Sequence, residues 1–249
     1  MNNKVRILNI EIQNITSDEL LQNLSEGILL TPNVDHLVKL QKDHEFYEVY
    51  QNAEWVVCDS KIVALGLKFL GLPIKEVIPG SSFFTEYYLY HKNNENIRIF
   101  LLGAAEGIAE KAMRNINKKT GREIVVGAHS PSFGFEKNEA ECLDIIKIIN
   151  QTNANILLVG VGAPKQEKWI AKYKSQFTNI KLFMALGATI DFEAGNIKRA
   201  PKIFQKLALE WFFRMCTDPK RLVKRYLLND MAFFYYLLKQ KLGIYINPF

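Results

Sequence analysis

Short apolar runs alternate with helical patterns along most of this 249-residue chain. Alternation of this kind is typical of an α/β fold, in which each strand of a parallel sheet is followed by a helix. We therefore expect a Rossmann-like, largely parallel sheet flanked by helices. The apolar runs, with the turns that directly follow them, occupy residues 5–10, 28–33, 54–60, 97–107, 123–130, 155–167 and 180–191.

The last fifth of the chain follows a different pattern. No strand pattern appears beyond about residue 199, and apolar residues recur at helical spacing instead. Asp218 is a candidate N-cap with Pro219 at the first helical position. We therefore divide the chain into an α/β domain, residues 1–195, and a helical, basic C-terminal appendage, residues 196–249.

Charge is unevenly distributed between these two parts. The chain carries a net charge of +6, but residues 196–249 hold 11 Lys and Arg against 3 Asp and Glu, whereas the remainder holds 21 against 23. A basic tail on a nearly neutral body suggests a polyanionic partner, either nucleic acid or an anionic membrane face.

Cysteine usage and hydropathy indicate the compartment. The three cysteines are sparse and widely spaced, so they form neither a disulfide framework nor a CxxC metal motif. The first residues do not resemble a signal peptide, and no stretch reaches the roughly 18 consecutive apolar residues of a spanning helix. We therefore expect a protein of the reducing cytosol.

Polar and glycine-containing segments follow five of the apolar runs. In open α/β sheets, ligands bind beyond the carboxyl ends of the strands, so these segments could converge on one crevice. Strand–helix loops are commonly polar and rich in glycine, which would account for the glycines without any ligand. The five segments are residues 31–33, 58–60, 103–107, 160–167 and 187–191.

Two of these segments carry residues that point to chemistry. Asp59 follows an apolar run and precedes a helix, so it is either an N-cap or a general base at the crevice floor. Pro164 suits the first position of a helix, where Lys165, Gln166 and the backbone amides of the first turn could hold a phosphate or sugar hydroxyls. For Glu167, complementing the helix dipole is the simpler interpretation.

Other motifs argue against common cofactors. The turn from Gly103 to Gly107 departs from the GxGxxG pattern, which disfavours an ordinary NAD-binding domain. No DxD motif is present, and Asp191-Phe-Glu193 is only a distant approximation. The four histidines lack metal-ligand spacing with any cysteine, so we expect no bound metal.

The tail has a candidate membrane-binding helix. Arg221, Lys224 and Arg225 can share one face, and four aromatic residues follow at 233–236. A basic face beside an aromatic, apolar face is how an interfacial helix binds anionic lipid. The alternative is a helix that packs its aromatic residues on the core and leaves its charges in water. An apolar helix face could also serve a homo-oligomer.

Several blocks together resemble one known family. GVGAPKQEKW, GATIDFEAGNIKRAP and LEWFFRMCTDPKRLVKRY occur in this order, and TPNVDH and CDS lie upstream. On these blocks the chain, from about residue 5 to 240, resembles the WecG/TagA/CpsF family of bacterial glycosyltransferases.

The resemblance implies an inverting hexosyltransferase that needs neither a metal nor another cofactor. It implies transfer of a sugar from a UDP-sugar, of the N-acetylmannosamine type or alternatively UDP-glucose, to a polyprenyl-diphosphate-linked saccharide. Such a step serves cell-surface polysaccharide synthesis at the cytoplasmic face of the cell membrane. The implied partners are the two substrates and an anionic membrane surface, and not nucleic acid.

The resemblance also implies residue roles. Asp59 would be the catalytic base, in a catalytic domain of residues 1–195 that is closed by a membrane-associating appendage. The family often has glycine where this chain has Ser60 and arginine where it has Val77, and both departures bear on specificity. The implied substrate-binding residues are Thr31, Asn33, Gly103, Lys165, Gln166, Glu167, Asp191, Arg199, Arg214, Arg221 and Arg225.

Two other classes of protein remain to be distinguished. A nucleotide-linked oxidoreductase or epimerase would share the alternating fold, although the glycine pattern disfavours it. A non-enzymatic module that binds membrane or nucleic acid through its basic tail would explain the charge alone. Binding of a sugar nucleotide by the body of the protein separates a transferase from both alternatives.

Overall fold

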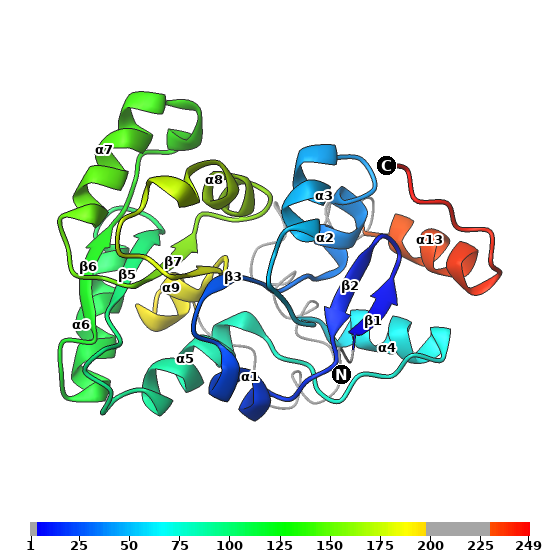
Figure 1. Cartoon of the computed structure of the whole chain (residues 1–249), viewed down its shortest axis with the longest axis horizontal. Helices are drawn as coiled ribbons and strands as arrows, with labels where there is room; N and C mark the ends of the chain where they lie inside the picture. Colours follow the sequence, from blue (N-terminus) through cyan, green and yellow to red (C-terminus); the bar gives the residue numbers. More distant parts are fainter. Residues whose placement is uncertain (1–3, 198–229) are drawn as a thin grey trace.

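The structure is a computed structural model that describes residues 4–197 and 230–249 (Figure 1). Its centre is a sheet of six strands, and every neighbouring pair in that sheet is parallel, as the alternating pattern predicts. The strand order across the sheet is β4-β3-β8-β7-β5-β6. The strands are β3 (Gly27–Leu30), β4 (Trp55–Val56), β5 (Ile99–Gly103), β6 (Val125–His129), β7 (Ile156–Gly160) and β8 (Leu182–Ala185).

Helices cover both faces of the sheet. Alternate strand residues point to opposite sides, and these residues are apolar on both sides, so each face must be buried. Phe100 and Leu102 of β5 belong to one buried cluster, whereas Ile99 and Leu101 belong to the other. The first cluster takes residues from α2 (Val34–Lys39), α3 (His44–Gln51), α4 (Lys61–Leu70), α7 (Glu139–Asn150), α8 (Lys165–Tyr173) and α13 (Ala232–Lys241). The second takes residues from α1 (Ser17–Asn23), α5 (Gly80–Tyr90), α6 (Ile108–Thr120) and α9 (Thr189–Glu193).

The first apolar run forms a separate antiparallel hairpin instead of a strand of the main sheet. Strand β1 (Lys4–Ile7) pairs with β2 (Ile10–Gln13), and Leu8 at the turn has a positive φ of 51°. The prediction of a single strand over residues 5–10 was therefore wrong in its end point. The later apolar runs, beginning with the one before TPNVDH, give the parallel strands. The hairpin lies at the edge of the body beside α4 and α13 (Figure 1).

Other strands are shorter than their apolar runs. The run over residues 54–60 contributes only Trp55–Val56 to the sheet, and the run over 180–191 divides into β8 and α9. The residues at the carboxyl ends leave the ladder to form the loops of the site. Short 3₁₀ turns at Phe135–Lys137 and Lys174–Gln176 complete the described elements.

The predicted start of α1 is confirmed. The Thr16 side chain accepts a hydrogen bond from the Glu19 amide, and the Glu19 carboxylate accepts one from the Thr16 amide. This reciprocal pair satisfies two of the helix-start donors, as the spacing of the two residues requires.

The end of the chain packs against the body. Phe233 and Leu237 of α13 are buried beside Gly66 of α4, where a Cβ would lie 3.0 Å from the Phe233 ring. Gln240 accepts a hydrogen bond from the Leu8 amide at 2.7 Å and donates one to the Arg6 carbonyl at 3.2 Å. The division of the chain at residue 195 stays a prediction.

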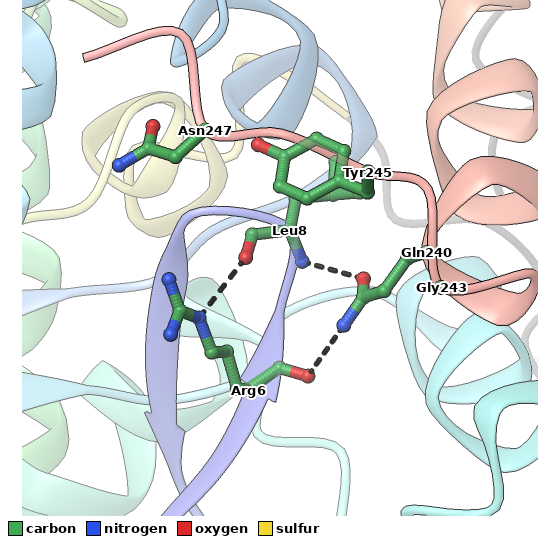
Figure 2. Close-up of a pocket in the computed structure, with 6 residues that line it drawn as sticks. All are labelled: Arg6, Leu8, Gln240, Gly243, Tyr245 and Asn247. Carbon is green, nitrogen blue, oxygen red and sulfur yellow. Dashed lines mark hydrogen bonds between the residues drawn. The ribbon is translucent and has the colours of Figure 1, made fainter.

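A shallow hollow of about 260 Å³ lies between the hairpin and this last segment (Figure 2). Arg6 and Leu8 line one side of it, and Gln240, Gly243, Tyr245 and Asn247 line the other. The polar groups are largely committed to the fold, because Tyr245 donates to Gln41 and Asn247 donates to Tyr47. These hydrogen bonds hold residues 245–247 against the segment that contains α2 and α3.

Candidate active site

Three strand ends meet through glycines at the carboxyl edge of the sheet. A Cβ on Gly103, the last residue of β5, would lie 2.5 Å from the Gly160 carbonyl oxygen, and a Cβ on Gly160, the last residue of β7, would lie 2.6 Å from that of Gly187. Backbone approaches this close exclude any side chain. The ends of β5 and β7 and the turn after β8 therefore lie against one another, and their convergence on one ligand crevice stays a prediction.

Asp59 lies on the neighbouring part of the same edge. Its Oδ1 accepts a hydrogen bond of 2.8 Å from the Gly80 amide, the first residue of α5. A Cβ on Gly80 would lie 3.0 Å from Thr31 Oγ1 and 2.7 Å from the Leu186 side chain. The start of α5 therefore contacts Thr31, Asp59 and the loop after β8. The positive end of the α5 helix dipole stabilises the negative charge of the Asp59 carboxylate.

The N-cap interpretation of Asp59 does not hold for the helix that follows it. Ser60 is the N-cap of α4, and its side chain accepts a hydrogen bond from the Ile62 amide. Asp59 is half-buried and is oriented by a helix that begins 21 residues later. Ser60, which differs from the usual family residue, therefore has a local structural role beside the carboxylate.

Asn33 and Lys39 connect α2 to this edge. Asn33 is the N-cap of α2, and its side chain accepts a hydrogen bond from the His36 amide at 3.3 Å. Lys39 donates to Asp35 at 2.7 Å and to the Ala163 carbonyl at 3.0 Å. The lysine, which the sequence gave no reason to select, links α2 to the turn after β7.

Gln166 is a buried brace. It is 2% exposed, and its Oε1 accepts hydrogen bonds from the amides of Gly162 at 3.0 Å and Gly187 at 3.1 Å. Its Nε2 donates to Glu167 Oε1 at 2.8 Å. All three bonds are to protein groups, so the side chain shapes the loops after β7 and β8.

Glu167 points into the protein and is 1% exposed. Burial raises the pKa of its carboxyl to about 7, opposed by the hydrogen bond from Gln166 and by the nearby charge of Lys39. Its Oε2 has no hydrogen-bond partner among the described residues. Glu167 lies in the first turn of α8, as the dipole interpretation requires, but its carboxyl is buried in the protein instead of facing solvent.

Two buried groups, Tyr50 and Cys58, have raised pKa values to which the charge of Asp59 contributes. His36 Nδ1 lies 2.7 Å from the Tyr50 hydroxyl, and burial, with the charges of Glu167, Asp59 and Asp35, raises the pKa of Tyr50 well above its ordinary value. Burial and Asp59 raise the pKa of the Cys58 thiol to about 12. Neither group supplies a nucleophile near neutral pH.

Two predicted residues lie farther from these contacts. Lys165 forms an ion pair of 3.1 Å with Glu136, and its ammonium lies 4.8 Å from the centroid of the exposed Phe133 ring. Asp191 accepts a hydrogen bond of 2.9 Å from the Asn196 side chain at the end of α9. Lys165 begins α8 and Asp191 lies in α9, the two helices that follow β7 and β8.

Four predicted residues lie outside the described part of the chain: Arg199, Arg214, Arg221 and Arg225. Their roles stay predictions. Within residues 4–197 and 230–249, no helix is long and apolar enough to span a bilayer.

Open parallel α/β sheets bind ligands at the carboxyl edge, where Asp59 and the glycines at the ends of β5 and β7 lie. Comparison with known proteins gives the family. Residues 5–246 match the model of the glycosyl transferase WecG/TagA/CpsF family, and the chain belongs to this family. The resemblance seen in the sequence blocks is thereby confirmed, and the protein is a glycosyltransferase.

Curated relatives agree with this assignment. An N-acetylglucosaminyldiphosphoundecaprenol N-acetyl-β-D-mannosaminyltransferase of Staphylococcus aureus strain MRSA252 is 29% identical over 248 residues, which cover 96% of this chain and 93% of the relative. The protein of the same name from strain NCTC 8325 is 28% identical over the same span. Membership of a glycosyltransferase family decides against both the oxidoreductase and the non-enzymatic binding module.

Proposed function

We propose that this glycosyltransferase moves a sugar of the N-acetylmannosamine type from UDP to a saccharide linked to a polyprenyl diphosphate. The product is an intermediate of a cell-surface polysaccharide. The name of the S. aureus relatives, which match over nearly the whole chain, supports this acceptor and this sugar. The donor nucleotide is inferred from the sequence resemblance and from the crevice.

The observation that carries the proposal is the placement of Asp59. Its carboxylate is anchored by the Gly80 amide, and Thr31 and Leu186, which directly follow β3 and β8, pack against Gly80. A carboxylate at this place can take the proton of an acceptor hydroxyl while that hydroxyl attacks the anomeric carbon. Attack from the side opposite the departing UDP inverts the configuration.

The leaving diphosphate needs positive potential, and no metal or cofactor is required in this scheme. We assign part of that potential to the start of α8 and to the ammonium group of Lys165, which also pairs with Glu136 at 3.1 Å. The arginines of the appendage would supply the remainder after it closes over the crevice. A general base of this kind typically contributes about 10²–10⁴-fold to the rate.

The lipid-linked acceptor implies contact with a membrane, and α13 has an exposed apolar surface that could bind one. Its inner stripe is buried against α4, whereas its outer stripe is apolar and half to two-thirds exposed. The exposed apolar residues in and beside α13 are Met231, Phe234, Tyr235, Leu238 and Leu242. Those in and beside α4 are Leu65, Phe69 and Leu72.

The charges beside this surface are basic. Lys239 lies over the Tyr235 ring, and Lys241 of α13 lies 5.4 Å from the centroid of the Phe69 ring of α4. Neither helix contains an acidic residue. This combination fits peripheral binding to an anionic membrane, which we place at the cytoplasmic, inner face of the cell membrane because the sugar nucleotide is there.

The test is a donor screen with a matched acceptor. The full chain is incubated with a panel of UDP-sugars and a short-chain polyprenyl-diphosphate N-acetylglucosamine, and the product is identified by mass. We expect elongation with UDP-N-acetylmannosamine. Elongation with UDP-glucose alone, the alternative donor that the family resemblance implies, would replace the donor assignment. No elongation with any donor would contradict the proposed function.

A further inference from the structure

We propose that Glu167 is a positioning residue: its carboxyl oxygen fixes the orientation of the Gln166 amide, and through it the two glycine loops that bound the sugar-nucleotide site. This inference rests on the proposed function for the identity of the ligand. Its structural part, the orientation of the loops, is independent of any ligand.

The hydrogen bonds of Gln166 define the need for such a residue. An amide side chain can bind in two orientations that differ by exchange of oxygen and nitrogen. The amides of Gly162 and Gly187 are both donors, so the Gln166 oxygen must face them, at 3.0 and 3.1 Å. The Gln166 nitrogen must then meet an acceptor, and Glu167 Oε1 supplies it at 2.8 Å.

The reverse orientation would set the Gln166 NH₂ group against two N–H donors. Both loops, at the ends of β7 and β8, would then lose their side-chain anchor. Glu167 therefore selects the one orientation that holds the loops together.

Packing alone does not explain a carboxyl at this position. Glu167 is 1% exposed, and its second oxygen has no hydrogen-bond partner among the described residues. An apolar side chain would avoid the cost of burying this group. Acceptance of the Gln166 bond is the contact that an apolar residue could not make.

The charged neighbours do not replace this contact. Lys39 and Asp35 of α2 and Tyr50 of α3 act on Glu167 or are acted on by it through their charges. The Lys39 ammonium itself binds Asp35 and the Ala163 carbonyl. The bond that links Glu167 to the site loops is the one to its neighbour Gln166.

The experiment uses the full chain with three substitutions at one position. Glu167→Gln keeps an oxygen that can accept the hydrogen bond from Gln166, and Glu167→Met removes that oxygen. Glu167→Asp keeps a carboxyl group, but its side chain is one methylene shorter and does not reach Gln166. We measure the dissociation constant of UDP by calorimetry and the hydrogen exchange of the Gly162 and Gly187 amides without ligand.

We expect Glu167→Gln to bind UDP within about twofold of the wild type. Glu167→Met and Glu167→Asp should weaken UDP binding roughly tenfold or more and accelerate exchange at both glycines, because a buried amide loses its partner. Tyr173→Phe is the matched control. It removes another buried polar atom of α8 that has no partner among the described residues, and it should change neither quantity.

The two proposals fail in different ways. If the wild type does not bind UDP, the proposed donor is wrong, and the exchange of the two glycine amides still decides whether Glu167 positions the loops. If Glu167→Met fails to fold, Glu167→Asp carries the comparison. Unchanged exchange and unchanged UDP binding in Glu167→Asp would overturn the inference.

Discussion

Replacing Glu167 with glutamine should change how the stability of the protein depends on pH. Burial raises the pKa of this carboxyl from an ordinary value of 4.5 to about 7 in the folded protein. The folded state therefore holds the proton more tightly than the unfolded state does. The stability conferred by the neutral carboxyl is fully present below pH 4.5 and is lost as the pH rises through about 7.

The magnitude follows from the two pKa values. Their difference of about 2.5 corresponds to about 3 kcal/mol when both states are fully ionised. Between pH 5 and pH 8, the free energy of unfolding of the wild type should fall by about 2.5 kcal/mol on account of this one group. Glutamine does not titrate, so the variant lacks this contribution.

The assay is urea denaturation of wild type and Glu167→Gln at pH 5, 6, 7 and 8. The difference in unfolding free energy between the two proteins should move in favour of the variant by about 2.5 kcal/mol across this range. For a chain of this length, that is a change of roughly 5–10 °C in the difference between their Tm values. Glu123→Gln, which alters an exposed carboxyl, is the control. If the difference in unfolding free energy between the two proteins does not change with pH, the claim that burial raises the pKa of Glu167 is wrong.

Three further outcomes test other parts of the structure. Leu238→Glu, on the exposed stripe of α13, should reduce co-sedimentation with anionic vesicles at least several-fold, whereas Leu143→Glu, equally exposed on α7, should not; equal losses would contradict membrane docking through α13. Gly160→Ala should lower stability by about 1–3 kcal/mol, because its Cβ would lie 2.6 Å from the Gly187 carbonyl oxygen; an unchanged Tm would show that the strand ends are not in contact. Thr16→Ala should cost about 0.5–2 kcal/mol by removing the capping box of α1, measured by urea denaturation.

The parallel sheet could be predicted from the sequence because its signals are local. Each buried strand is a short apolar run, and both faces of the sheet are covered, so β5 and β7 are apolar at every position. The carboxyl-edge location of the site follows from the parallel order alone. The capping box of α1 needed only residues three apart.

The parts that sequence reasoning missed depend on distant contacts. Asp59 is anchored by Gly80, and nothing local to either residue indicates the pairing. Glu167 has the sequence position of a surface helix-start carboxylate, yet α2 and α3 cover it. The sequence GVGAPKQE shows which residues are unusual, whereas only the packing shows that Gln166 and Glu167 bind each other.

The hairpin of β1 and β2 was missed for a different reason. Residues 5–10 have the apolar character of a sheet strand, and the turn uses Leu8 with a positive φ instead of glycine. Turn signals based on residue type do not identify such a turn. The hairpin is instead completed by Gln240, more than 230 residues away, which binds the backbone of Arg6 and Leu8.

Single-turnover sugar transfer by Asp59→Asn tests the central claim most directly. Asparagine can still accept the hydrogen bond from the Gly80 amide, so the turn should persist while the base is lost. We expect the transfer rate to fall by about 10²-fold or more with UDP affinity within about twofold of the wild type, and Asp144→Asn on α7 to behave as the wild type. Transfer at the wild-type rate by Asp59→Asn would contradict the assignment of this aspartate as the group that activates the acceptor.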